Sequence, residues 1–201
     1  MNEARLISRN TSLTTLPTLK AEWKVSFEFK ANNFNAMGQL LHMTTGGQGT
    51  GAGSKYGDRT PAIWAHPTRG FLVTSAVNGK YSYAKWIKPL PPAGQWTTVE
   101  VKQEVEGTKT IYSITIGGKE VISVTNSKPR TFQNVKVFAS SEWYTPLDGF
   151  MKNLLIQHKS HGKSLQHYTY SNSCFVFKFP PMTKAAYSPG LLPTIFQNNI
   201  P

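Results

Sequence analysis

The strongest constraint on the fold is a strict alternation of apolar and polar residues in Trp23–Lys30. The apolar positions are Trp23, Val25, Phe27 and Phe29, and every residue between them is polar. Side chains of a β-strand point alternately to its two faces. The segment is therefore predicted to be a strand with one buried face and one solvated face.

Roughly ten segments of this kind follow one another, separated by turn residues at intervals of 8–12 residues. Asn78-Gly79 is the strongest two-residue hairpin signal among the turns. No amphipathic helix pattern of useful length occurs before about residue 160, and the connections are too short and too glycine-rich for crossover helices. The sequence predicts an all-β fold, an antiparallel two-sheet sandwich of the jelly-roll type. The other expected strands are 13–19 (an edge strand), 39–43, 62–66, 71–77, 81–86, 95–103, 110–116, 120–125, 135–138 and 150–156.

Three regions are expected along the chain. Residues 1–10 are polar and predicted to be a flexible N-terminus, and residues 11–159 form the sandwich. Residues 160–201 lose the strand pattern and are predicted to be a largely irregular tail, in which the apolar run Cys174–Phe179 could instead pair with a sheet edge as an extra strand. Cys174 is the single cysteine, which excludes a disulfide within the chain and a multi-cysteine zinc site.

The chain is strongly basic, with 22 Lys and Arg against 10 Asp and Glu, a net charge of +12 and a pI near 9.8. This balance favours polyanionic partners such as acidic glycans, anionic membranes or nucleic acid. Because the lysines are scattered, solubility alone is the competing explanation, and nucleic acid is not expected as a partner. No segment approaches the roughly 18–20 apolar residues of a membrane span, and the first residues lack the apolar stretch of a signal peptide.

Four segments together resemble the concanavalin A-like lectin/glucanase superfamily and, more narrowly, its laminin-G-like domains. Their order and spacing match a single domain over about residues 10–158. The resemblance implies an extracellular location and recognition of a glycan or a protein partner. The four segments are Trp23-Lys24-Val25-Ser26-Phe27-Glu28-Phe29, Gly38-Gln39-Leu40-Leu41, Gln95-Trp96-Thr97-Thr98-Val99-Glu100-Val101 and Asp148-Gly149-Phe150-Met151-Lys152-Asn153-Leu154-Leu155-Ile156.

The superfamily that the chain resembles includes glycanases, which carry the acidic pattern E-x-D-x-x-E on one strand. This sequence lacks that pattern. A retaining glycosidase needs two carboxyl groups about 5–5.5 Å apart. Glu100, Glu104 and Glu106 form the only acidic cluster, without an aspartate between them, and are expected on a solvated face opposite lysines. We therefore expect a non-enzymatic recognition domain. The alternative is a glycosidase-like enzyme with an atypical or degenerate site.

The predicted ligand-binding residues are large aromatics that could stack on sugar rings and basic residues that could meet sulfates or carboxylates. Trp143 and Tyr144 lie in a connection between strands, where ligand contacts concentrate. Large aromatics in a sandwich are more often part of the core, and the alternation assigns Trp23 and Trp96 there. Trp64, Lys88 and Arg69 are weaker candidates. The predicted set is Trp143, Tyr144, Trp86, Lys85 and Arg59.

The resemblance implies calcium, Ca²⁺, as a candidate metal, because laminin-G-like domains often bind calcium at a loop rim. Calcium takes several oxygen ligands, usually including carboxylates. The chain has two aspartates, Asp58 and Asp148. Asp58 follows the glycine-rich segment Thr44–Gly57, whose carbonyl groups could contribute, and it is the predicted metal ligand. A structural role in a turn is the alternative for both aspartates.

Overall fold

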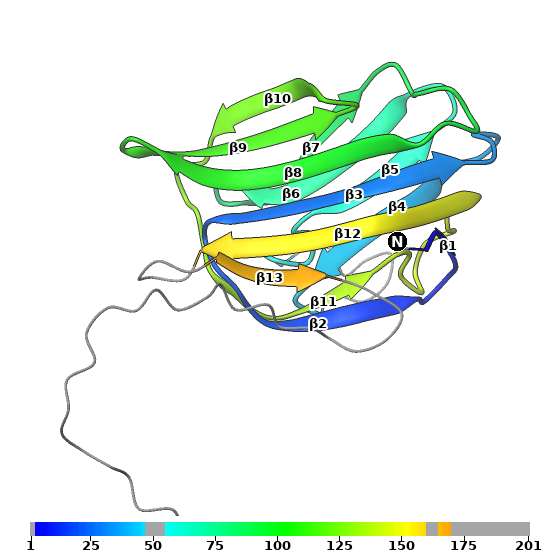
Figure 1. The fold of residues 1–201 in the computed structure, drawn as a ribbon. Helices are drawn as coiled ribbons and strands as arrows, with labels where there is room; N and C mark the ends of the chain where they lie inside the picture. Colours follow the sequence, from blue (N-terminus) through cyan, green and yellow to red (C-terminus); the bar gives the residue numbers. More distant parts are fainter. Residues whose placement is uncertain (1–2, 47–54, 160–164, 170–201) are drawn as a thin grey trace, which may run out of the picture.

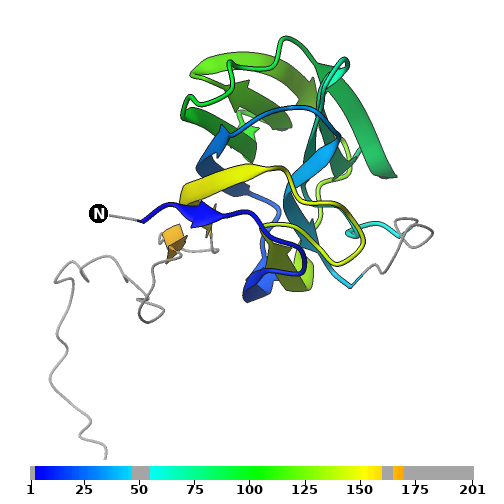
Figure 2. The ribbon, with the colours of Figure 1, turned by 90° about the vertical axis from the view of Figure 1, so that its right-hand side faces the viewer.

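The computed structural model describes residues 3–46, 55–159 and 165–169, which form two antiparallel sheets packed face to face (Figures 1 and 2). The predicted all-β sandwich is confirmed. Sheet A has seven strands, in the order β1 (Arg5–Leu6), β12 (Gly149–Lys159), β3 (Trp23–Ala31), β8 (Thr97–Glu106), β9 (Lys109–Ile116) and β10 (Lys119–Thr125), with β13 (Leu165–Thr169) also paired to β12. Sheet B has six, in the order β2 (Ser12–Leu19), β11 (Phe132–Phe138), β4 (Gly38–Thr44), β5 (Ala62–His66), β6 (Gly70–Val77) and β7 (Lys80–Ile87).

The core lies between the sheets and follows from the alternation. In β3, every second residue from Trp23 to Ala31 is buried and each residue between is partly exposed. Phe29 of sheet A meets Phe71 of sheet B edge to face, with ring centroids 5.6 Å apart. The hydroxyl of Tyr112 in sheet A donates to Ser75 Oγ in sheet B over 2.9 Å. Apolar packing and one buried polar contact therefore join the two layers.

The prediction that Trp96 belongs to the core is wrong. Trp96 directly precedes β8, in which Thr97, Val99 and Val101 point inward. Trp96 therefore has the opposite parity and lies half-buried on the outer face of sheet A. There the ammonium groups of Lys30 and Lys152 stand 5.3 and 4.2 Å from its ring centroid. Its indole covers the sheet and contacts cations rather than filling the interior.

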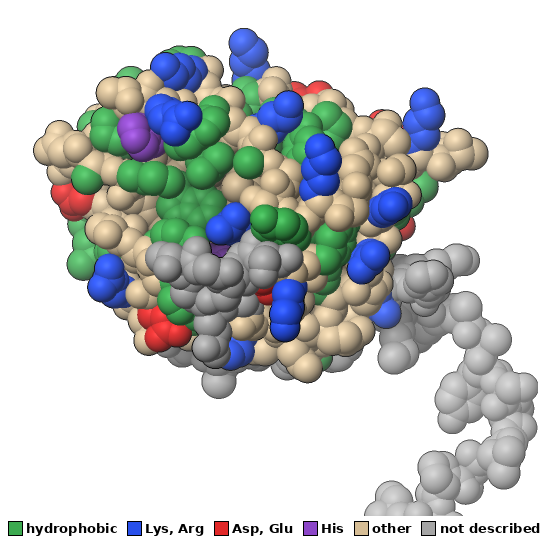
Figure 3. Space-filling view, turned by 180° about the vertical axis from the view of Figure 1, so that it is seen from behind, with side chains coloured by type: hydrophobic (Ala, Val, Ile, Leu, Met, Phe, Trp, Pro, Cys, Tyr) green, Lys and Arg blue, Asp and Glu red, His purple; other side chains and the backbone are tan. Residues whose placement is uncertain are grey.

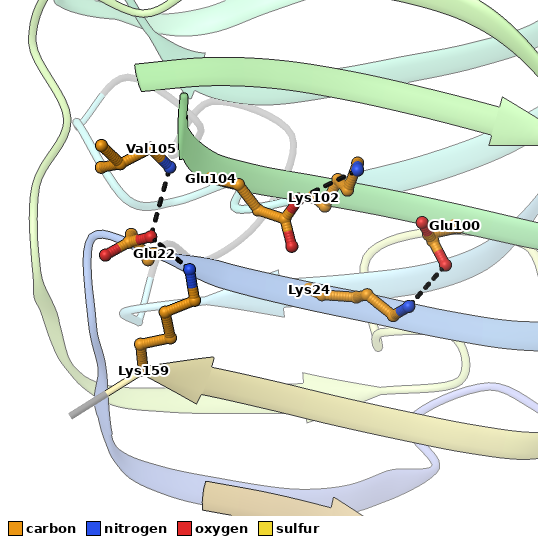
Figure 4. Close-up of polar contacts among 7 residues, drawn as sticks. All are labelled: Glu22, Lys24, Glu100, Lys102, Glu104, Val105 and Lys159. Atoms are coloured by element: carbon orange, nitrogen blue, oxygen red, sulfur yellow. Dashed lines mark hydrogen bonds and ion pairs between the residues drawn. The ribbon is translucent and has the colours of Figure 1, made fainter. Parts of the chain in front are cut away.

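The outer face of sheet A carries a series of ion pairs, as the sequence predicted for its acidic cluster (Figure 4). Lys24 pairs with Glu100 and Lys102 with Glu104, each at 2.9 Å. At the end of the sheet, Lys159 pairs with Glu22, which also accepts a hydrogen bond from the backbone of β8. Four lysines of this sheet are thus paired with glutamates.

The chain ends differ from expectation in part. Arg5 and Leu6 pair with β12, and Ile7 is 3% exposed, so this part of the predicted flexible N-terminus belongs to the sandwich. At the other end, β12 is followed by β13, which pairs with the same edge of β12 as β1 does. Cys174–Phe179 and most of the glycine-rich segment lie outside the described residues. Among the described residues, no helix has the length and apolar character needed to cross a membrane.

Candidate functional site

The outer face of sheet B carries a row of mainly large side chains that crosses four strands. Gln39 of β4, Trp64 of β5, Leu72 of β6 and Trp86 of β7 are opposite one another in register. Opposed residues of antiparallel strands point to the same face, and their neighbours Ile63 and Val73 belong to the core. Strands lie about 4.8 Å apart, so Trp64 and Trp86 are roughly 10 Å apart on the surface. Figure 3 shows this face, with Lys and Arg side chains around a hydrophobic centre.

One end of the row is the exposed indole of Trp86, which is 38% accessible. The Arg69 guanidinium carbon lies 4.5 Å from its ring centroid, and the His66 ring meets it edge to face at 5.7 Å. The tight turn between β5 and β6 positions Arg69, because the backbone amides of Thr68 and Arg69 both donate to His66 Nδ1. A local turn motif therefore presents a cation over an aromatic ring.

The other end of the row is built from distant parts of the chain. Tyr144 packs edge to face on Trp64, with centroids 5.1 Å apart, which leaves Trp64 only 3% exposed. The guanidinium of Arg59 lies 5.8 Å from the Trp64 centroid. It donates to Ser82 Oγ over 2.9 Å and to the Tyr144 hydroxyl over 3.3 Å. These contacts restrain Arg59 on the face without neutralising its charge.

His42 packs against the aromatic side chains at this end of the row. Its Nε2 lies 2.8 Å from the carbonyl oxygen of Asp58, and its ring meets Trp143 and Tyr144 edge to face at 5.8 and 6.3 Å. Burial lowers the pKa of His42 to about 4, and the nearby positive charge of Arg59 acts in the same direction. The imidazole is therefore neutral at pH 7 and donates its Nε2 proton to Asp58.

The connection that carries Trp143 and Tyr144 is anchored to β4. The amide and the hydroxyl of Ser141 both donate to Gln39 Oε1, over 2.8 and 2.9 Å. Ser140 Oγ also donates to the Tyr144 carbonyl oxygen over 3.3 Å. These hydrogen bonds hold the connection against β4, whose Gln39 is the first residue of the row.

Asp58 has the contacts of a turn residue. It is 3% exposed, and its Oδ2 accepts a hydrogen bond from the Lys55 amide over 2.8 Å. Within the part of the chain that the structure describes, no group of three His, Cys, Asp or Glu side chains is placed to hold a metal ion. Asp58 as a calcium ligand stays a prediction.

The structure brings four of the predicted ligand-binding residues to one face and separates the fifth. Trp143, Tyr144, Arg59 and Trp86 lie on the outer face of sheet B, whereas Lys85 lies opposite core residue Val73 on the other side of β7. His42, His66, Leu72 and Ser82 also belong to this face, but the sequence analysis did not predict them as site residues. The hairpin signal at Asn78-Gly79 could have indicated Leu72 and Ser82, because it pairs β6 with β7.

No protein-family model and no curated protein sequence matches the chain. Among solved structures, it is similar to the native heptameric SAP-like pentraxin of Limulus polyphemus, with 11% identity over 77% of this chain and 75% of that chain and a TM-score of 0.52. It is also similar to domains LG4-5 of the mouse laminin α1 chain, with 14% identity over 84% of this chain and 47% of that chain and a TM-score of 0.50. Likeness at this identity concerns the fold alone. The chain has the concanavalin A-like β-sandwich fold that the four sequence segments predicted.

Proposed function

We propose that the outer face of sheet B is a non-enzymatic recognition surface for a negatively charged glycan. One observation carries the proposal: Arg59 and Arg69 lie over the indoles of Trp64 and Trp86, and the described part of the chain pairs neither guanidinium with a carboxylate. A guanidinium binds anionic oxygens in a bidentate manner. An exposed indole offers an apolar surface that suits the face of a sugar ring.

The charge distribution of the sandwich supports the choice of ligand. Four of the ten acidic residues form ion pairs with lysines on sheet A. Arg59 and Arg69 on sheet B lack such partners among the described residues, so their charge is available to an anion from solution. A surface of unmatched positive charge raises the association rate of anionic ligands and makes binding sensitive to salt.

The proposal includes the extracellular setting that the resemblance to laminin-G-like domains implies. It leaves the acidic cluster without a catalytic role, because Glu100 and Glu104 are each engaged with a lysine. Hydrolysis of a polysaccharide that is lost in Glu104→Gln would instead support the glycosidase alternative.

The test is binding to glycan pairs that differ only in sulfation or carboxylation. We expect preference for the acidic member and a loss of about tenfold to a hundredfold in affinity for Arg69→Gln, since a charge-assisted hydrogen bond contributes roughly 1.5–3 kcal/mol. Trp86→Ala should also weaken binding. Lys109→Gln removes one exposed charge from sheet A and is the matched control, with unchanged affinity expected.

Two results would contradict the proposal. One is equal binding of the acidic and neutral glycans, and the other is full affinity in a double variant with Arg59→Met and Arg69→Gln. Each measurement is repeated with calcium and with chelator. Binding that requires calcium would revive Asp58 as a metal ligand.

A further inference from the structure

A second candidate surface lies where the two sheets end side by side. The edge strands β7 of sheet B and β10 of sheet A border a groove of about 620 Å³ (the strands are labelled in Figure 1). Within the described residues, β7 pairs only with β6 and β10 only with β9. Each strand therefore has one row of backbone N–H and C=O groups without a partner strand, which is a template for a further strand.

The groove has an apolar floor and a basic rim. Tyr83, Ile122 and Val124 line it and are partly buried against the core. Lys85, Lys88 and Lys119 also line it, against a single acidic residue, Glu120. The Lys85 ammonium lies 5.4 Å from the Tyr83 centroid, so at least one of these charges stands directly over the floor.

We propose that this groove binds an extended acidic segment of a partner protein, which pairs as an additional strand with the free edge of β7. The unpaired backbone favours a polypeptide, because strand addition derives its affinity from main-chain hydrogen bonds. The alternation of a strand directs every second side chain of the added segment into the groove, where the apolar floor and the ammonium groups of Lys85 and Lys119 lie together. β7 is the pairing edge because it carries Lys80 and Lys85 and no acid, whereas β10 includes Glu120.

The same charges argue against two other occupants. A second copy of the chain pairing through its own β7 would place lysines against lysines, and edge lysines are a common protection against such pairing. Residues 170–201 of the chain contain Lys178 and Lys184 and no acidic residue, so they lack charge complementarity to the groove. An acidic partner, in contrast, is attracted by the same lysines that disfavour a second copy of the chain and residues 170–201.

This inference does not depend on the proposed glycan surface. Lys85 and Lys119 lie on the groove side, while Arg59 and Arg69 contact side chains of the opposite, outer face. Trp86 borders both regions and is left out of the test. Arg69→Gln should weaken glycan binding and leave peptide binding unchanged, so that failure of either proposal is recognised separately.

The test uses a labelled synthetic peptide of alternating glutamate and valine, 8 residues long like β7, and the full chain. The matched probes replace each glutamate by lysine or methylate the backbone nitrogens. We expect the acidic peptide to bind at least about tenfold more tightly than either. Lys85→Glu and Lys119→Glu should each weaken it about tenfold, while Lys109→Glu on β9 leaves it unchanged. Amide hydrogen exchange of Lys80–Ile87 should slow when the peptide is bound.

Several outcomes would overturn the inference. They are equal affinity for the acidic and basic peptides, tolerance of backbone methylation, and binding that leaves the exchange of β7 unchanged. A sulfated oligosaccharide that binds, loses affinity in Lys85→Glu and has no peptide counterpart would assign the groove to a glycan instead.

Discussion

Acidification should destabilise the protein through His42. The side chain is 4% exposed, and its pKa falls from an ordinary value of 6.5 to about 4 in the folded chain, mainly through burial. The stabilising contribution of the neutral imidazole is complete above pH 6.5. Below that pH, the unfolded chain binds a proton that the folded chain accepts only near pH 4. With 1.36 kcal/mol for each pKa unit, the folded state loses about 3 kcal/mol at pH 4 relative to pH 7 from this residue.

The assay compares urea unfolding of the wild-type chain and His42→Gln across this range. Glutamine does not titrate, and its amide can still donate to the Asp58 carbonyl oxygen. The other titrating groups are common to both proteins, so they cancel in the difference between the two free energies of unfolding. We expect the wild type to lose about 3 kcal/mol relative to the variant between pH 7 and pH 4. Parallel pH profiles would contradict the lowered pKa of His42, because they would mean that His42 is protonated equally in the folded and unfolded states.

Three further predictions concern stability and are measured by chemical denaturation. Gly70→Ala and Gly94→Ala both place alanine at positive φ (87° and 79°), which costs about 1–2 kcal/mol. Only at Gly70 would the added Cβ clash with a backbone atom, the carbonyl oxygen of Ile87 in β7, so that variant should lose roughly 1–3 kcal/mol more. Equal losses in the two variants would contradict the close approach of Gly70 to β7. Tyr112→Phe should cost about 1–2 kcal/mol, because it removes the donor to a buried serine of the opposite sheet, and an unchanged midpoint would argue against that bond. A double-mutant cycle on Lys24 and Glu100 should give less than about 1 kcal/mol and decline with salt, whereas a larger, salt-independent coupling would contradict a solvated pair.

The hairpin at Asn78-Gly79 shows how far local sequence rules extend. The predicted turn is present, with φ of 55° and 75° at its two central residues. Simple counting from Val77↔Lys80 would place Trp86 opposite Phe71, facing the core. The register shifts by one between Ser75 and Val77, so Trp86 lies opposite Leu72 and faces outward. A single extra residue in one strand exchanges the two faces of everything beyond it.

The same shift determines the position of Lys85. It moves to the groove side of β7, away from the other predicted ligand-binding residues. Trp96 illustrates a related difficulty: the alternation was interpreted as placing it in the core, whereas Val99 and Val101 are buried residues of β8 and have the other parity. The ammonium groups of Lys30 and Lys152, from two other strands, lie over the Trp96 ring. Such partners are distant in sequence and leave no local signal.

The strands, most of their turns and the two-layer sandwich follow from local sequence rules, because alternation and turn chemistry act between neighbouring residues and one face of each sheet must be buried. The basic charge and the placement of the acidic cluster opposite lysines could also be predicted from the sequence. Which charges remain unpaired and which aromatics share a face depends instead on how distant strands pack. Arg59 and Tyr144 are 85 residues apart and meet only because sheet B brings β5, β7 and the connection after β11 together. Surface sites of this kind depend on register and on contacts between distant segments, which local pattern does not encode.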